Sequence, residues 1–581
     1  MRDTINTEII CTGSAESIIR YGVKNKLDLG QQHAFEVLCA TVVSSFLDDC
    51  IAQEESEHVR QDLVASRKLL ADLAHEDSRG DKPLRLFLTG PAGAGKSTIL
   101  TALISYVQEF CNRIGCTFDK GVIRLTALTG AAATEIRGQT THKECKIGSK
   151  TKITDQDIRE WLNTRLLVVD EISFAGYTKF LMKLSKCLQT LTECNDHLYG
   201  RVPIVFIGDF LQLEPVLSTD CIYKVDDSYF WEMALNLMIE LDGQWRFIDC
   251  PQLQHIFNTV REEGFTDEIR ELINSRVLSS ELSLTDDSNL KIATYKNRQK
   301  EIFNNTIFME HVRQHHSKDD DGIIPECSIL VKAGLTWKHN NKTFTDFEQN
   351  LFLGEATEAN TRQKKDNSKR VDPLLKLFSG CEIMVTENKD VAGGIANGTT
   401  AVLEKVVLKP NRNPHKVKYN GYWILAVNSD DVDRLELRWS SDSLYQGKFS
   451  VQAQTWECKS KIRIATEQNR EKSTDLLIKI STFLITLNGA TTGHKLQGKT
   501  VASLFVGEYA PRNIRNWLYV VLSRVRKLEN LFLAERLPDD TDPPDTRMTK
   551  MIDKLRNSIL LKCDMPSIER LRQQLSEELH N

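Results

Sequence analysis

The stretch GPAGAGKS, residues 90–97, constrains this chain more than any other feature of its sequence. Its pattern is G-x-x-x-x-G-K-[ST], in which small residues let backbone N–H groups wrap closely round the phosphates of a nucleotide. Such a loop needs a strand before it and a helix after it. The apolar run LRLFLT precedes it, and STILTALISYVQEF follows at helical period. We therefore predict that Lys96 contacts the β- and γ-phosphates and that Ser97 contacts Mg²⁺. The other loop residues predicted to bind the nucleotide are Gly90, Gly93, Gly95 and Thr98.

A second match to the same pattern, GHKLQGKT, begins at Gly493. Its inner positions hold histidine, lysine, leucine and glutamine, whose side chains are too bulky for a close wrap round phosphates. The segment that follows, VASLFVG, reads as a strand and not as a helix. We therefore predict a single nucleotide site, at the first match, and a different role for the second.

Short apolar runs recur after Leu84, as LRLFLT, GVIRLTAL, RLLVVD and VPIVFIG. Runs of this length are typical of strands buried on both faces, which predicts an α/β fold with a parallel sheet covered by helices. Parallel character is expected again at TFLITL and VASLFVG. Between these regions, residues 399–482 carry short alternating stretches, which predict a small inserted antiparallel module.

Two of the apolar runs end in polar residues suited to nucleotide hydrolysis. RLLVVDEIS places Asp170 and Glu171 at the end of a strand, where one acid can hold Mg²⁺ and the other can deprotonate the attacking water. VPIVFIGDFLQLEPV places Asp209 and Gln212 just past another strand, where a glutamine can contact the γ-phosphate or the water. The alternative for Asp170 and Glu171 is that they only end a strand, and the P-loop upstream makes this less convincing. The alternative for Asp209 and Gln212 is a polar turn.

A third polar cluster follows the apolar run in YVVLSRVRKLENLFL, which holds Arg524 and Arg526. An arginine is the preferred donor to a transferring phosphoryl group, because its planar fork neutralises spread charge. An arginine in such a position is by itself usually a surface residue. This prediction therefore depends on the rest of the set.

Composition narrows the class of protein. A chain of 581 residues is too long for one core, so several domains are expected. No apolar run reaches the length of a membrane helix, and the N-terminal stretch lacks the pattern of a secretory signal. The 14 cysteines include no C-x-x-C pair, which predicts reduced thiols. The net charge of −5 means that contacts with nucleic acid must be local.

Together these motifs resemble a superfamily-one DNA helicase of the B branch, most closely the PIF-type 5′-to-3′ helicases, from about Gln31 to Leu533. The resemblance rests on several segments of the sequence. They are LTALTGAAATEIRGQTTH (motif Ia), DEIS (motif II), GDFLQLEPV (motif III), QWRFID (motif IV), GCEIMVTENKDVAGGIANGTTAVLE (the N-G-T segment), TGHKLQGKT (motif V) and LSRVR (motif VI). The second P-loop match therefore resembles motif V, which in the family contacts the nucleic-acid backbone.

The resemblance also implies roles for single residues. Gln31, in LDLGQQHAF, would read the adenine as the family's Q motif does. Arg246 would contact a phosphate, and Arg524 would be the arginine finger, supplied across a cleft between two domains. With Lys96, Glu171 and Gln212 they form the implied catalytic set. The residues implied to contact nucleic acid are Thr129, Gly130, Thr141, His142, His494 and Lys495, and the implied Mg²⁺ ligands are Ser97 and Asp170.

The implied architecture is two RecA-like parallel-sheet domains with a small inserted β-barrel-like (SH3-like) module. The expected division is 1–83 for an N-terminal helical segment, 84–245 for the first domain with a short insert near 142–160, 246–398 with 483–537 for the second, 399–482 for the module and 538–581 for a linker and a helical tail.

The implied activity is ATP-dependent, Mg²⁺-dependent unwinding of DNA with movement 5′ to 3′ on the single strand. The expected partners are single-stranded and duplex or forked DNA, with no membrane. The protein is expected to be a monomer in the nucleus or cytoplasm, with the mitochondrion as a further alternative. Two other functions stay open: an RNA helicase of the same branch, and a nucleic-acid-stimulated ATPase that remodels complexes without unwinding.

Overall fold

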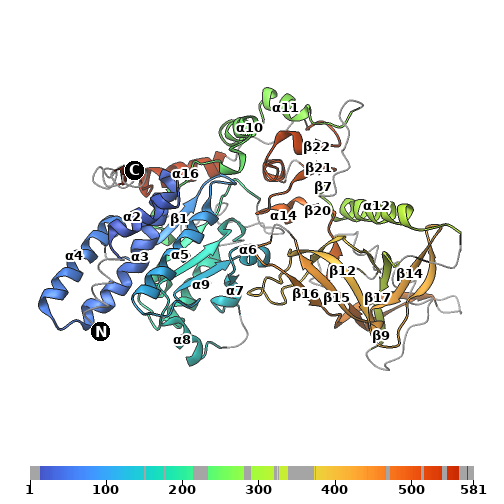
Figure 1. Cartoon of the computed structure of the whole chain (residues 1–581), viewed down its shortest axis with the longest axis horizontal. Helices are drawn as coiled ribbons and strands as arrows, with labels where there is room; N and C mark the ends of the chain where they lie inside the picture. Colours follow the sequence, from blue (N-terminus) through green and yellow to red (C-terminus); the bar gives the residue numbers. More distant parts are fainter. Residues whose placement is uncertain are drawn as a thin grey trace. The chain divides into compact units, whose positions relative to one another are not determined.

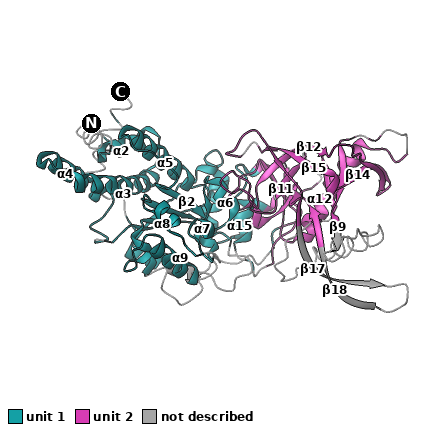
Figure 2. Ribbon diagram, turned by 90° about the horizontal axis from the view of Figure 1, so that it is seen from below, with its two compact units in different colours: residues 1–273, 512–528, 537–581 teal, residues 274–511, 529–536 magenta. Residues whose placement is uncertain are grey.

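The computed structural model describes residues 13–80, 82–148, 152–175, 178–213, 233–279, 290–319, 324, 326–337, 372, 374–440, 443–465, 471–511, 514, 516–538, 546–561, 572–573 and 577. The chain forms two compact units (Figure 2): unit 1 comprises residues 1–273, 512–528 and 537–581, and unit 2 comprises residues 274–511 and 529–536. Across the described ranges, no helix has the length and apolar character needed to cross a membrane.

A six-stranded sheet forms the centre of unit 1, in the order β3-β2-β4-β5-β1-β6 (Figure 1). Each pair of neighbouring strands runs parallel, which confirms the parallel sheet predicted from the apolar runs. All four residues of β5 are buried, as expected for a central strand covered on both faces. The strands are β1 Arg85–Thr89, β2 Ile123–Ala127, β3 Gln139–Thr140, β4 Leu166–Asp170, β5 Ile204–Ile207 and β6 Leu237–Glu240.

The helices of unit 1 include one long helix, α3, which is buried from Gln31 to Ser44 and packs against α2, α4 and α5. Its first turn is closed by a capping box, in which Asp28 accepts from the backbone of Gln31 and the Gln31 side chain accepts from the backbone of Asp28. The helices are α2 Ala15–Lys24, α3 Leu29–Gln53, α4 Glu57–Leu73, α5 Lys96–Arg113, α6 Gly130–Glu135, α7 Thr141–Glu144, α8 Asp155–Trp161, α9 Thr178–Leu191, α10 Pro251–Glu262, α11 Asp267–Asn274, α15 Trp517–Leu522 and α16 Thr546–Ser558. Short 3₁₀ turns lie at Ile172–Phe174, Leu198–Arg201 and Trp245–Phe247.

A smaller parallel sheet lies in unit 2, in the order β20-β7-β21-β22. Helix α12 packs against β7 and β20, and the side chain of Asn304 on α12 bonds both the backbone N–H and the carbonyl of Ala490 at the start of β20. The elements are β7 Leu290–Thr294, α12 Asn297–His315, β20 Ala490–Thr492, α14 Gly493–Leu496, β21 Ser503–Val506 and β22 Leu531–Leu533.

The rest of unit 2 consists of mainly antiparallel sheets, in the orders β10-β8-β14-β13, β16-β15-β12-β11-β19 and β17-β18-β9. Only the β14–β8 pair is parallel among the described pairs of these sheets. The strands are β8 Ser328–Lys332, β9 Gly334–Trp337, β10 Leu374–Phe378, β11 Glu382–Val385, β12 Thr400–Leu408, β13 His415–Tyr419, β14 Tyr422–Asn428, β15 Val432–Trp439, β16 Lys448–Val451, β17 Gln454–Ala465, β18 Glu471–Thr482 and β19 Ile485–Leu487. Strands from residues 328–385 thus pair with strands from residues 400–482.

One prediction about strand direction is wrong. TFLITL was expected to begin the return of the parallel sheet, but its strand β19 pairs antiparallel with β11. Parallel pairing begins only at Ala490. All three residues of β19 are buried, and a strand buried on both faces has the same apolar run whichever direction its neighbour takes. The pattern therefore predicts burial but not strand direction.

Candidate nucleotide site and nucleic-acid contacts

The P-loop follows β1 and ends where α5 begins, at Lys96. Gly93 and Gly95 have φ values of +87° and +86°, which residues with a Cβ rarely adopt. A Cβ on Gly93 would lie 2.6 Å from the Cβ of Arg246, and a Cβ on Gly95 would meet the side chain of Gln31. The loop therefore requires glycine both for its backbone and for the close approach of two other segments.

The side chain of Lys96 turns back over this loop. Its Nζ donates to the carbonyls of Gly90, at 2.7 Å, and Pro91, at 3.0 Å. Burial lowers the pKa of Lys96, and the nearby carboxylates of Asp209 and Glu171 oppose that effect. Ser97 and Thr98, the next two residues of α5, are exposed.

Gln31, on the first turn of α3, lies directly against the P-loop. Its Nε2 donates to the carbonyl of Ala94 at 3.0 Å, and the side chain is only 4% exposed. The fold thus brings the predicted adenine-reading residue to the loop from well upstream in the chain.

A tryptophan beside Gln31 was missed by the sequence analysis. The backbone N–H of Trp245 donates to the carbonyl of Gly93 at 3.1 Å, and its indole N–H donates to Asp28 at 2.5 Å. Trp245 is 45% exposed, so part of this large side chain faces solvent next to the P-loop. The signal was the aromatic residue directly before Arg246 in QWRFID.

The two acids predicted from DEIS lie at the end of β4. Asp170 is the last residue of the strand, and its Oδ1 accepts from the backbone N–H of Glu171 at 2.8 Å. Burial, reinforced by the neighbouring charge of Glu171, raises the pKa of Asp170. Glu171 has φ +55°, a left-handed conformation that is uncommon for a residue with a Cβ and is often found where a functional side chain is held in place.

Beyond β5, Asp209 belongs to a buried network that the sequence analysis also missed. Arg261, on α10, donates to Asp209 at 2.8 Å and to the Tyr519 hydroxyl at 2.9 Å. Burial alone would lower the pKa of Arg261, but Asp209 and Tyr519 raise it overall. No local motif marks Arg261. Tyr519 could have been noticed as a lone hydroxyl in the apolar run YVVL.

Gln212 and the two predicted arginines lie in the same unit as this network. Asn516 donates to the carbonyl of Gln212 at 3.2 Å, and Arg246 donates to the carbonyl of Ser523 at 3.1 Å. The Arg524 side chain is 1% exposed. Burial and the nearby charge of Arg246 lower its pKa to about 9.

Arg524, which follows α15, belongs to unit 1, the unit that contains the P-loop. Residues 512–528 belong to unit 1, whereas the sequence analysis expected the finger on the second domain. The physical reason is that Tyr519 and Ser523 of this segment bond Arg261 and Arg246, which also belong to unit 1. Arg526, in contrast, is exposed.

Four of the residues implied to contact nucleic acid lie near α6 and α7 of unit 1. Thr129 caps α6 by accepting from the backbone N–H of Ala132, and Gly130, the first residue of α6, is buried. His142 is exposed, on α7. Thr141 is fully buried and its hydroxyl bonds that of Thr126 at 3.0 Å, so in this structure it exposes no group to a strand.

The other two lie in unit 2, on the short helix α14. The Lys495 Nζ donates to the side chain of Asn397 at 2.7 Å, and the Lys499 Nζ donates to the carbonyl of Gly398 at 2.8 Å. Burial and the charge of Lys495 lower the pKa of His494. Motif V is thus bound to the N-G-T segment.

The donors available for a cation at the P-loop are the Ser97 hydroxyl and the Asp170 carboxylate. Among the described residues, no group of three or more His, Cys, Asp or Glu side chains could hold a metal ion. A hydroxyl and one carboxylate suit Mg²⁺, which usually keeps waters and takes its remaining ligands from nucleotide phosphates. The donor set therefore fits Mg²⁺ bound together with a nucleotide.

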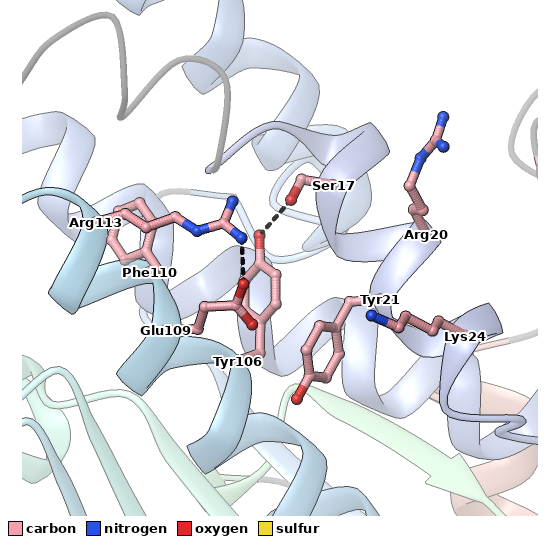
Figure 3. A pocket seen from close by; sticks show the side chains of 8 residues that line it. All are labelled: Ser17, Arg20, Tyr21, Lys24, Tyr106, Glu109, Phe110 and Arg113. Atoms are coloured by element: carbon pink, nitrogen blue, oxygen red, sulfur yellow. Dashed lines mark hydrogen bonds and ion pairs between the residues drawn. The ribbon is translucent and has the colours of Figure 1, made fainter. Parts of the chain in front are cut away.

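A separate pocket of about 200 Å³ lies between α2 and α5 (Figure 3). Both charge signs line it: Arg113 pairs with Glu109, and Arg20 and Lys24 lie across from them. Tyr106 donates to Ser17 at 3.5 Å. None of the residues predicted to bind nucleotide lines this pocket, so it is distinct from the candidate site.

The fold and the site define a class before any family is considered: a P-loop protein built on parallel sheets. Solved structures carry the same architecture. Pif1 helicase from Bacteroides, solved in complex with ADP-AlF3 and ssDNA, matches with a TM-score of 0.55 at 18% identity, over 83% of this chain and 96% of that one. Pif1 helicase from Candida albicans matches with a TM-score of 0.54 at 19% identity, over 82% and 95%. The fold is therefore α/β with RecA-like domains.

Sequence comparison finds similarity to one family. Residues 63–280 match the PIF1-like helicase family. The chain is 31% identical over 207 residues to the ATP-dependent DNA helicase RRM3 of Saccharomyces cerevisiae, covering 33% of this chain and 27% of that protein. It is 24% identical over 470 residues to the ATP-dependent DNA helicase Pif1 of a Psychrobacter species, covering 77% and 65%. The matches thus span less than two thirds of these relatives' lengths. The chain is thus similar in sequence to PIF1-like helicases, with the family match confined to residues 63–280.

Proposed function

We propose that this protein is an ATP-dependent DNA helicase that moves 5′ to 3′ on single-stranded DNA and unwinds duplex DNA. The observation that carries the proposal is the convergence of separate motifs in unit 1. Gln31, on α3, lies against the P-loop, Lys96 lies among the carboxylates of Asp209 and Glu171, and Arg524 lies beside Arg246. The names of the relatives, all ATP-dependent DNA helicases, support the same activity.

The nucleotide would be held from two sides. The P-loop N–H groups and Lys96 would bind the phosphates, and Gln31 would recognise the adenine edge. The exposed indole of Trp245 offers a flat apolar face on which the base can stack. Ser97 and Asp170 would hold Mg²⁺, which when bound would neutralise part of the phosphate charge.

Hydrolysis would use the side chains that lie beyond β4 and β5. Glu171 would orient the attacking water and accept its proton, and Gln212 would contact the γ-phosphate or that water. Arg524 and Arg246 would stabilise the charge that develops on the transferred group. The Asp209–Arg261–Tyr519 network would hold the segment of Gln212 and the helix before Arg524 in place.

The DNA strand would contact unit 1 near Thr129, Gly130 and His142, beside the buried Thr141. It would contact unit 2 at His494 and Lys495. Because Lys495 bonds Asn397 and Lys499 bonds Gly398, motif V and the N-G-T segment would respond together when the strand binds. This coupling would link strand contact to the parallel sheet that carries β20.

The proposal is tested by strand displacement on two matched duplexes, one with a 5′ tail and one with a 3′ tail, with ATP and magnesium. We expect displacement only from the 5′ tail, and no displacement by a Glu171→Gln variant that still binds ATP. Displacement only from the 3′ tail would contradict the polarity. ATP consumption without displacement would favour a remodelling ATPase, and stronger stimulation by RNA than by DNA would favour an RNA helicase.

Replacing Arg524 tests its role as the finger. We expect Arg524→Ala to lower kcat by roughly 10³-fold to 10⁵-fold, because the finger acts on charge that develops in the transition state. The KM for ATP should change much less. Steady-state ATPase assays measure both, with Arg526→Ala as the control, since Arg526 is an exposed neighbour. A raised KM at unchanged kcat would count against the finger role.

A further inference from the structure

The P-loop packs against two elements that come from elsewhere in the chain. One is α3, whose Gln31 lies against Gly95 and bonds Ala94. The other is the segment after β6: a Cβ on Gly90 would lie 2.6 Å from the carbonyl of Leu241, and a Cβ on Gly93 would lie 2.6 Å from Arg246. The placement of Gln31 and Trp245 beside the P-loop therefore depends on where α3 and β6 are held.

We define the C-terminal segment as the described residues 546–561, 572 and 573, and its first part holds β6 in place. Leu560 forms a parallel bridge with Met238, whose backbone N–H and carbonyl bond Ile559 and Leu561, each at 2.9 Å. Arg556, on α16, donates to both carboxylate oxygens of Glu240, the last residue of β6, at 2.7 Å each. The chain continues from Glu240 to Trp245 and Arg246 within six residues. This fork is the strong, geometrically specific form of an arginine–carboxylate pair.

The same C-terminal segment braces α3 through a second ion pair. Arg572 donates to both carboxylate oxygens of Glu36, through Nε at 3.0 Å and through Nη2. The Glu36 side chain is 1% exposed, and it also accepts from Gln32 at 2.5 Å. Glu36 lies on α3, five positions after Gln31, so the pair holds the helix close to its adenine-reading end.

We propose that the C-terminal segment positions the base-recognition side of the nucleotide site, with Arg556 and Arg572 as positioning residues. Arg556 holds the strand that leads to Trp245, and Arg572 holds the helix that carries Gln31. This inference rests on the proposed function, in which Gln31 and Trp245 receive the adenine. Neither arginine touches the nucleotide. Arg246, which follows Trp245, has a separate anchor in its bond to the carbonyl of Ser523, so we expect the main effect on the fit of the base.

Loss of either arginine is expected to affect recognition of the adenine base. When α3 or β6 is less firmly held, Gln31 and Trp245 shift while the wrap of the P-loop round the phosphates persists. Binding energy is then lost equally from the ground state and the transition state, so KM rises and kcat is kept. Preference for ATP over GTP falls at the same time, because only the adenine contacts discriminate between them.

The experiment measures kcat and KM for ATP and for GTP, in the full-length chain, for wild type, Arg556→Ala, Arg572→Ala, Arg572→Lys and Gln31→Ala. We expect both alanine variants to raise the KM for ATP roughly tenfold, the equivalent of 1.4 kcal/mol, with kcat within about twofold of wild type. The ATP-over-GTP preference should fall by a similar factor. Arg572→Lys keeps the charge and should recover part of the preference.

Two matched controls remove residues of the same segment that do not brace α3 or β6. Lys550→Ala removes one exposed positive charge from α16, and Gln573→Ala removes the exposed neighbour of Arg572. Both should keep the wild-type preference. Thermal unfolding separates positioning from loss of fold: Arg572→Ala leaves the buried Glu36 unpaired, whereas Arg556→Ala changes a surface pair and should stay folded.

The outcomes separate this inference from the proposed function. If Gln31→Ala keeps the ATP-over-GTP preference, the assignment of Gln31 is wrong whatever the arginine variants do. If Gln31→Ala loses the preference but folded Arg556→Ala and Arg572→Ala keep it, the C-terminal segment has no positioning role. If Arg572→Ala does not fold, the result for Arg556→Ala decides. A fall in kcat at unchanged KM would also overturn the inference.

Discussion

The chain contains two segments with the same pattern, GPAGAGKS and GHKLQGKT, and they have different structures. In the first, a loop with glycines at positive φ joins β1 to α5, a helix of 18 residues. In the second, a helix of four residues, α14, occupies the inner positions, and the next regular element is the strand β21. The pattern alone therefore does not determine the local structure.

Lys96 and Lys499 occupy the same position of the pattern but have different hydrogen-bond partners. Lys96 folds back on the carbonyls of its own loop, among the carboxylates of Glu171 and Asp209. Lys499 instead donates to the carbonyl of Gly398, in the N-G-T segment. A P-loop is defined by small inner residues and by the strand and helix around it, and bulky inner residues turn the same spacing into a packing motif.

The largest difference between the two segments should appear when each lysine is removed. We expect Lys96→Ala to lower ATP turnover by about 10³-fold, because it removes the cation nearest the phosphates. Lys499→Ala should keep the turnover measured without DNA and lower only its stimulation by single-stranded DNA. ATPase assays with and without DNA measure both. Equal loss of DNA-free turnover in the two variants would break the comparison.

A smaller difference should appear at the last residue of each pattern. We expect Ser97→Ala to need roughly tenfold more Mg²⁺ for half-maximal hydrolysis, the effect of losing one ligand worth about 1.4 kcal/mol. Thr500→Ala should follow the wild-type magnesium titration, since motif V holds no nucleotide. Removal of Mg²⁺ with EDTA should stop hydrolysis in all three proteins. A shifted titration for Thr500→Ala would point to a second metal-dependent site.

The smallest difference should appear at the glycines. Gly93 and Gly498 have φ values of +87° and +83°, so alanine at either position should cost about 1–2 kcal/mol of folding free energy. Only Gly93→Ala adds a clash with Arg246 beside the nucleotide, so only that variant should raise the KM for ATP. Denaturant unfolding and ATP titration measure the two effects. A raised KM in Gly498→Ala would show that the segments are less distinct than we infer.

Local patterns predicted much of unit 1. β1, β2, β4 and β5 occur where continuous apolar runs indicated them, and their polar ends carry Asp170, Asp209 and Gln212 as expected. The direction of a strand could not be predicted from such runs. β19 has the buried apolar run expected of a parallel strand, but it pairs antiparallel with β11. A run of apolar residues reports burial, and the neighbour that covers it is chosen by distant parts of the chain.

The sequence by itself determined which segment has the form of a phosphate-binding loop, because that form depends on small residues, backbone conformation and neighbouring elements within about thirty positions. Only the tertiary structure showed that Arg261 joins Asp209 to Tyr519, that Arg524 belongs with unit 1, and that Arg556 and Arg572 pair with Glu240 and Glu36. The partners in these contacts are far apart in the sequence, so no helical or strand periodicity predicts that they meet. An arginine has the same local signature whether it lies in solvent or on a buried carboxylate, so its partner is decided by the folded chain.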